Sequence, residues 1–159
     1  CFGFQLNGGV IMYLPSFRLD GSVAVVTGGS RGIGRALAIG LAEAGADVAI
    51  IARAEKELNE AAEEIRQTGR KAYIVTADLI QKTEIDKAID KLSTETNGIS
   101  ILINNVGINI RTPALEVTDD QWEKIIQTNL KSAFFTSQAC AKQMKKKGYG
   151  RIVNIASVA

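Results

Sequence analysis

Short apolar runs alternate with longer polar segments over most of the chain. From residue 22 onward, each run leads into a Gly-rich or polar turn and then into a segment with helical periodicity. The runs are continuously apolar, as in strands that are covered on both faces. We expect strands at Val23–Val26, Val48–Ile51, Tyr73–Val75, Ile101–Ile103 and Ile152–Ile155. This alternation predicts an α/β domain with a parallel sheet.

The segments between the strands carry start and stop signals for helices. The expected helices cover residues 34–44, 55–67, 84–96 and about 119–146. The first three end near glycines, which accept the left-handed conformation without a Cβ clash: Gly45, Gly69 and Gly98. Thr118 and Gln121 have capping-box spacing at the start of the fourth and longest helix. Its expected apolar side consists of Trp122, Ile125, Ile126, Ala133 and Phe134.

Right-handed crossovers favour a doubly wound sheet with the strand order 3-2-1-4-5. A chain of 159 residues is long enough for one such domain. We expect an N-terminal arm over residues 1–17 and the domain over residues 18–159. Residues 1–11 lack the features of a signal peptide. Either Met12 is the natural start or these residues are an ordinary arm.

Composition excludes several classes of function. The chain has no histidine and two cysteines, so it cannot supply a His-based triad or a Cys/His zinc cluster. Its 19 basic and 17 acidic residues are mixed along the chain, which leaves no large basic field for nucleic acid. The apolar stretches are too short to span a membrane. We therefore expect a cytoplasmic protein with no metal site and no nucleic-acid or membrane partner.

A glycine-rich turn joins the first strand to the first helix. Residues 27–34 read TGGSRGIG. Gly28 permits the tight turn, Gly32 lets the backbone approach a pyrophosphate, and Gly34 lets the helix and strand pack closely. The helix N-terminus then presents free N–H groups to an anion. The turn indicates a dinucleotide site, and the alternative is a purely structural turn.

The spacing TGxxxGxG resembles that of the classical short-chain dehydrogenase/reductase family, and three further segments fit. Residues 104–107 read NNVG after the fourth strand, where the family has NNAG, so Val106 is a small departure. Asp78 follows the third strand, where the family has an Asp beside the adenine. Asn129 and Ser157 fall at the family's tetrad asparagine and catalytic serine. The resemblance covers residues 18–159 and implies a Rossmann-type fold that lacks the last strands of the family.

The resemblance also implies which residues form the site. Ser157 would hydrogen-bond the substrate oxygen, and Asn129 would help to hold a water and a lysine in a proton relay. Judged alone, Ser157 is a loop residue and Asn129 is an asparagine on an apolar helix face, which needs polar partners. The expected cofactor-binding residues are Thr27, Gly28, Ser30, Arg31, Gly32, Ile33, Gly34, Arg53, Asp78, Leu79, Asn105, Val106 and Gly107.

The end of the second strand bears on the choice of cofactor. An NAD site would place Asp or Glu there, on the ribose 2′-OH. This chain has Ala52 and Arg53, with no carboxylate to repel a 2′-phosphate. Arg53 and Arg31 offer two guanidinium groups that could bind that phosphate. NADP(H) is therefore favoured over NAD(H), and the alternative is that the arginines are solvated surface charges.

The family's acid/base pair, Tyr-x-x-x-Lys, does not occur in this sequence. Position +4 after Tyr13, Tyr73 and Tyr149 is Phe17, Ala77 and Val153. Without a tyrosine whose pKa is lowered by a lysine, no group exchanges the substrate proton while hydride moves. We expect these 159 residues alone to be inactive, as a piece of a longer protein whose fifth strand is an uncovered edge.

Residues 108–113, INIRTP, resemble the sugar-acid (gluconate-type) branch of the family. Arg111 could bind a substrate carboxylate bidentately, or it could be a loop arginine in water. Alternatives are a 3-oxoacyl-carrier-protein reductase and a non-catalytic NADP-binding module. The resemblance further implies a homodimer or homotetramer in which the fourth helix forms a subunit contact.

Overall fold

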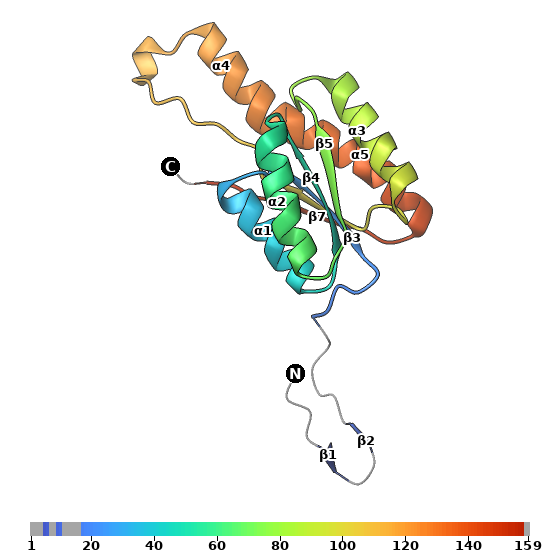
Figure 1. Ribbon diagram of the computed structural model, residues 1–159. Helices are drawn as coiled ribbons and strands as arrows, with labels where there is room; N and C mark the ends of the chain where they lie inside the picture. Colours follow the sequence, from blue (N-terminus) through green and yellow to red (C-terminus); the bar gives the residue numbers. More distant parts are fainter. Residues whose placement is uncertain (1–4, 7–8, 11–16, 158–159) are drawn as a thin grey trace.

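The computed structural model describes residues 5–6, 9–10 and 17–157. Met12 and most of the expected N-terminal arm lie outside these ranges. Gln5–Leu6 (β1) and Gly9–Val10 (β2) form a short antiparallel pair. From residue 22 onward the chain forms one parallel sheet with helices on both faces (Figure 1).

The sheet contains the five expected strands. They are β3 (Val23–Thr27), β4 (Asp47–Ala52), β5 (Ala72–Thr76), β6 (Ile101–Asn104) and β7 (Arg151–Asn154). All neighbours are parallel and the spatial order is β5-β4-β3-β6-β7. In order of sequence this is 3-2-1-4-5, so the predicted doubly wound topology is confirmed. The predicted strand ends differ by no more than one residue, because the apolar runs themselves form the buried strands.

Helices cover the two faces of the sheet, as Figure 1 shows. The helical segments are α1 (Gly32–Glu43), α2 (Glu55–Gln67), α3 (Lys82–Glu95), η1 (Ala114–Glu116), α4 (Asp119–Ile126), η2 (Gln127–Lys131) and α5 (Ser132–Lys147). Alternate strand residues face opposite sides: Ala24 and Val26 pack with α1 and α2, whereas Val25 packs with α3 and α5. The continuous apolar runs thus supply two cores, one on each face.

Glycines end the first three helices as predicted. Gly45, Gly69 and Gly98 have φ of 109°, 82° and 84°, in the region that other residues rarely adopt. The predicted capping box is also present, since Thr118 Oγ1 accepts the backbone N–H of Gln121 and the Gln121 side chain accepts the N–H of Thr118.

The chain is helical over Asp119–Lys147, close to the expected bounds, but it is not α-helical throughout as predicted. A π-turn, η2, separates α4 from α5, and the N–H of Ser132 donates to the carbonyl of Gln127, five residues back. The Ser132 hydroxyl donates to the carbonyl of Thr128. The apolar side was also misjudged, because Trp122 and Phe134 are 60% and 59% exposed. Trp122 lies in α4, which extends past the sheet in Figure 1 and has no buried residue.

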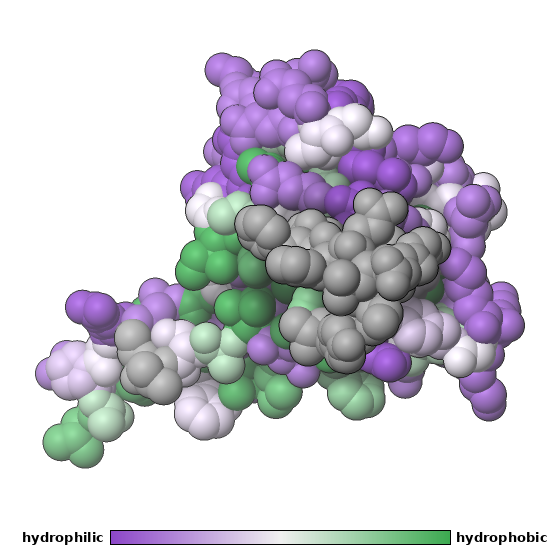
Figure 2. Space-filling view, turned by 90° about the horizontal axis from the view of Figure 1, so that it is seen from below, coloured by the Kyte–Doolittle hydropathy of each residue, from purple (hydrophilic) through white to green (hydrophobic). Residues whose placement is uncertain are grey.

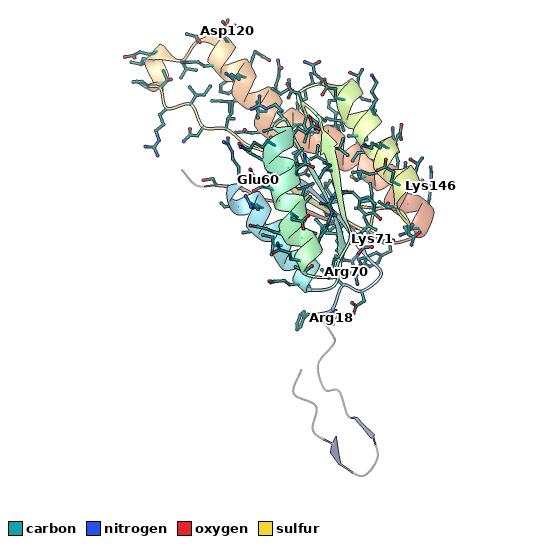
Figure 3. The ribbon with its side chains drawn as sticks, viewed as in Figure 1. Arg18, Glu60, Arg70, Lys71, Asp120 and Lys146 are labelled. Atoms are coloured by element: carbon teal, nitrogen blue, oxygen red, sulfur yellow. The ribbon has the colours of Figure 1, made fainter. Side chains whose placement is uncertain are left out.

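Charged groups are paired at the amino ends of the strands. Asp47 at the start of β4 accepts the N–H of Lys71 at 3.1 Å and forms an ion pair with Arg70, also at 3.1 Å. Arg70 and Lys71 lie at the opposite end of the sheet from α4 (Figure 3). These contacts fix the start of β5 against β4. They lie at the amino ends of the strands, away from the carboxyl ends.

The strand at one edge of the sheet is open. All four residues of β7 are exposed, and β7 pairs only with β6 in the described part of the chain. Hydrophobic surface is visible on the face shown in Figure 2. The exposed large apolar residues include Ile152 and Val153 of β7. No described helix combines the length and hydropathy needed to cross a membrane.

Candidate functional site

An open cavity of about 810 Å³ lies at the carboxyl ends of the strands. This is the edge at which ligands bind in doubly wound sheets, and the volume is in the range of cofactor and ligand sites. Loops after β3, β4, β5 and β6 all contribute to it. The lining residues that sequence reasoning named are Gly28, Ser30, Arg31, Gly32, Ile33, Arg53, Asp78, Leu79, Asn105, Val106 and Gly107.

The glycine-rich turn has little room for side chains where it meets the rest of the fold. A Cβ at Gly34 would lie 2.2 Å from the carbonyl oxygen of Gly28 and 2.5 Å from Asn105 Nδ2. Gly29, which sequence reasoning passed over, is equally constrained, since a Cβ there would lie 2.5 Å from Ile50 Cγ2. At Gly32, by contrast, a Cβ would meet open space. The turn is packed against the sheet behind it and open on the cavity side.

Two helix N-termini face this cavity without a side-chain cap. Arg31 precedes α1 and Ala54 precedes α2, and neither N-cap accepts a hydrogen bond through its side chain. The first N–H groups of a helix need acceptors and carry a partial positive charge. Arg31 and Arg53 add two exposed guanidinium groups to the same cavity. The donor set therefore fits phosphate groups of a dinucleotide.

Thr27 and Gly34 do not line the cavity but support its wall. Thr27 Oγ1 accepts the backbone N–H of Asn105 at 2.9 Å and donates to the carbonyl of Ile103 at 3.3 Å. Asn105 Nδ2 returns a hydrogen bond to the Thr27 carbonyl at 3.2 Å. These contacts join the ends of β3 and β6 and place Asn105, Val106 and the following glycine along one side.

Asn129 lies in the π-turn and clamps the segment after β6. Its Oδ1 accepts the N–H of Ile108 at 2.8 Å, and its Nδ2 donates to the carbonyl of Ile108 at 2.9 Å. Asn129 is exposed rather than buried in the core. It does not line the cavity itself, whereas Ile108 does. The amide thus holds cavity-lining backbone in place.

Ser157 and Arg111 are not brought to the cavity. Both are exposed, and neither is among its lining residues in the described part of the chain. Ser157 follows β7, which Asn104 ties to β6 through a hydrogen bond from its Nδ2 to Asn154 Oδ1 at 2.9 Å. The serine therefore lies beyond the carboxyl end of the strand adjacent to β6.

The cavity also contains a carboxylate that sequence reasoning missed. Positions 52 and 53, at the end of the second strand, hold no acidic group. The structure places Glu57, from the first turn of α2, on the cavity wall, where its Oε2 accepts a hydrogen bond from Ser30 Oγ at 3.3 Å. The sequence signal that could have identified Glu57 is an acidic residue in the first turn of a helix that begins at the carboxyl edge of the sheet. Other lining residues not predicted are Ile51, Ala52, Ala54, Ala77, Ile80, Ile108, Lys124, Thr128 and Ser132.

The described residues offer no reactive thiol and no metal centre at this site. Cys140 is buried in α5, and burial raises the pKa of its thiol to about 12, so the thiol stays protonated near neutral pH. No group of three or more His, Cys, Asp or Glu side chains is arranged for metal binding in the described ranges. The charged and donor groups that line the cavity are backbone N–H groups, the cations Arg31, Arg53 and Lys124, and the carboxylates Glu57 and Asp78.

Comparison with known proteins agrees with this geometry. The family model for short chain dehydrogenase matches residues 22–159. A 2-dehydro-3-deoxy-D-gluconate 5-dehydrogenase from Escherichia coli is 41% identical over 148 residues, which cover 92% of this chain and 58% of the relative. A gluconate 5-dehydrogenase from Gluconobacter oxydans is 39% identical over 142 residues (89% and 56%).

Two further matches carry names that do not refer to gluconate. A 3-oxoacyl-[acyl-carrier-protein] reductase from Aquifex aeolicus is 39% identical over 142 residues, which cover 89% of this chain and 57% of the relative. The solved structure of a short-chain type dehydrogenase/reductase from Mycobacterium marinum is 36% identical, with a TM-score of 0.86 and coverage of 89% and 58%. The chain thus spans little more than half the length of the relatives that it matches.

Proposed function

The chain belongs to the short-chain dehydrogenase family, and we propose that the complete protein is an NAD(P)(H)-dependent oxidoreductase that interconverts a secondary alcohol and a ketone. The observation that carries this proposal is the cavity beside the glycine-rich turn, into which two uncapped helix N-termini and two arginines project their positive charge. A bound nicotinamide dinucleotide would supply the hydride transfer. The chain's own residues would bind and orient it.

The proposed preference is for NADP(H). Arg31 and Arg53 line one cavity although they come from different loops, so both guanidinium groups can approach a single phosphate. Asp78 and Leu79 line the same cavity from the loop after β5 and are proposed to contact the adenine part of the cofactor. Gly32, with open space in front of it, is proposed to lie against the pyrophosphate.

Asn129 and Ser157 are proposed to act on the substrate side. Asn129 holds the backbone of Ile108 through two hydrogen bonds, which supports a role in shaping that side of the cavity. The Ser157 hydroxyl would bind the substrate oxygen. Because the sequence contains no Tyr-x-x-x-Lys pair, we expect no turnover by these 159 residues.

For the complete protein we propose a sugar acid as substrate, with Arg111 as a carboxylate ligand. Relatives at 41% and 39% identity are named for gluconate-type substrates, and this supports the proposal. A relative at 39% identity named as a 3-oxoacyl-carrier-protein reductase supports the alternative. We further propose a cytoplasmic homodimer or homotetramer that binds neither nucleic acid nor membranes. The exposed Trp122 and Phe134 support a subunit contact along the α4–α5 segment.

A direct test is fluorescence titration of the purified chain with NADPH and NADH. Saturable binding with tighter association of NADPH is expected. Failure of both nucleotides to bind a chain with the expected circular dichroism would contradict the proposed site. Substrate class is tested on a form of the protein that includes Tyr-x-x-x-Lys. Turnover of gluconate-type acids supports the proposal, turnover of acyl-carrier-protein thioesters supports the reductase, and turnover of neither supports a non-catalytic binding module.

A further inference from the structure

Glu57 is a carboxylate on the same side of the cavity wall as the glycine-rich turn, whereas Asp78, the other lining carboxylate, lies in the loop after β5. It lies in the first turn of α2, and Arg31, Arg53 and Ser30 line the same cavity. We infer that Glu57 is a specificity-determining residue, whose charge opposes the 2′-phosphate of NADP(H) and thereby reduces the preference for NADP(H) over NAD(H). This inference rests on the proposed function and refines its cofactor selectivity.

The carboxylate is held toward the turn after β3. Its Oε2 accepts a hydrogen bond from Ser30 Oγ at 3.3 Å. Ser30 is only 5% exposed, so this hydroxyl is a fixed donor rather than a mobile surface group. The side chain of Glu57 is itself partly buried. Its position is thus set by a contact between α2 and the glycine-rich turn, which are the two segments that contribute the uncapped helix ends.

The charge of Glu57 is not cancelled by a close cation. In the part of the chain that the structure describes, the ion pairs within 4 Å do not include Glu57. Arg31 and Arg53 share its cavity but are left to interact with a ligand. A 2′-phosphate drawn to these arginines would therefore also experience repulsion from the carboxylate. A ribose 2′-OH is neutral and can donate a hydrogen bond to a carboxylate, so this repulsion does not weaken the binding of NAD(H).

An acidic residue in a first helical turn also has a simpler role, because it interacts favourably with the helix dipole. Glu55 occupies the same turn of α2 but does not line the cavity. Glu60, labelled on α2 in Figure 3, also lies outside the cavity. Substitution of Glu55 changes the charge at the helix end, and substitution of Glu60 changes the net charge. Of the three substitutions, only that of Glu57 changes the charge at the helix end and the net charge and also removes a carboxylate from the cavity lining.

The test is to measure the dissociation constants of NADPH and NADH for the wild-type chain and for Glu57→Gln, Glu55→Gln and Glu60→Gln. Glutamine keeps the shape of Glu57 and an oxygen acceptor for Ser30, so the variant is expected to retain wild-type circular dichroism. In Glu57→Gln at low salt, NADPH should bind roughly three- to tenfold more tightly, with no gain for NADH. The gain should shrink in 0.5 M salt, because ions screen charges in an open cavity.

The control variants should leave the NADPH-to-NADH ratio within about twofold of wild type. An unchanged ratio in Glu57→Gln, with both nucleotides still bound, would overturn this inference and leave the proposed function intact. An equal change in Glu55→Gln would also overturn it, since the effect would then belong to the helix end. If the folded wild-type chain binds neither nucleotide, the proposed function fails and this inference fails with it.

Discussion

Thr27 Oγ1 and the backbone N–H of Asn105 form a hydrogen bond of 2.9 Å that joins positions 78 residues apart. The same oxygen accepts the N–H of Val106 at 3.3 Å and donates to the carbonyl of Ile103 at 3.3 Å. One buried hydroxyl therefore satisfies three backbone groups where β3 and β6 end. It aligns the glycine-rich turn with the opposite wall of the cavity.

Thr27→Val is expected to destabilise the chain and to weaken nucleotide binding. Valine has a similar shape but leaves two partly buried N–H groups without their acceptor, at a cost of roughly 1–3 kcal/mol. Urea unfolding measures the loss of stability and NADPH titration measures the loss of affinity. Thr76→Val at the exposed end of β5 is the control and should change both by little. Equal effects at the two positions would contradict the role given to Thr27.

Gly34→Ala is expected to lower nucleotide affinity at least tenfold. A Cβ would lie 2.2 Å from the Gly28 carbonyl, so the turn must move away from α1, and overpacking of this kind typically costs roughly 1–3 kcal/mol. Gly40→Ala is the matched control, because it lies in the same helix and its Cβ would meet nothing within 4 Å. Gly40→Ala should instead stabilise α1 by roughly 0.5–1 kcal/mol. Thermal melts and NADPH titration of the two variants distinguish these outcomes.

Much of the fold followed from the sequence because local patterns and tertiary packing agree. The buried strands are continuous apolar runs, and the helices end at glycines with positive φ. The π-turn could not be predicted, because the bond from Ser132 to the Gln127 carbonyl leaves no signature in apolar periodicity. The same turn and the extension of α4 past the sheet explain why the expected burial of Trp122 was wrong.

The candidate site was predicted less completely. Glycines and polar residues that directly follow strands were found, because the carboxyl ends of parallel strands meet at one edge. Glu57 was missed, because its place depends on how the first turn of α2 packs against Ser30, and it lies five residues beyond the end of the second strand, past positions 52 and 53. The motif positions of Ser157 and Arg111 gave no information on their distance from the cavity, which neither residue lines.

Arg53→Ala is expected to remove most of the preference for NADPH. Loss of a charge-assisted hydrogen bond costs roughly 1.5–3 kcal/mol, so NADPH affinity should fall about tenfold or more, with NADH affinity nearly unchanged. Arg66→Ala on α2 is the control, because Arg66 pairs with Glu63 on the exposed face and does not line the cavity. A parallel loss of NADH binding would show that Arg53 supports the fold of the site rather than its selectivity.

Stability is expected to fall at alkaline pH through Cys140. Burial raises the pKa of this thiol from 9.0 to about 12. The unfolded chain therefore loses the thiol proton first, and the stabilisation that is complete below pH 9 is lost as pH rises toward about 12. By pH 10 the total loss from this group should be about 1.4 kcal/mol, of which about 1 kcal/mol is lost between pH 9 and pH 10. Urea unfolding of the wild type and of Cys140→Ala over this range isolates the contribution, because the alanine variant should lack it.

Asn129→Ala is expected to loosen the backbone after β6 while α4 and α5 stay folded. The amide is the partner of both the N–H and the carbonyl of Ile108, at 2.8 and 2.9 Å, and alanine removes both contacts. Hydrogen exchange at the Ile108 N–H should therefore accelerate, whereas the amides of α5 should keep their protection. Asn59→Ala is the control, because among the described residues the Asn59 side chain bonds to the Glu55 carbonyl within α2, away from the cavity. Since Ile108 lines the cavity, NADPH affinity should fall several-fold in Asn129→Ala and not in the control. Unchanged exchange at Ile108 would mean that the segment is held by its other neighbours, and Asn129 would then have no positioning role.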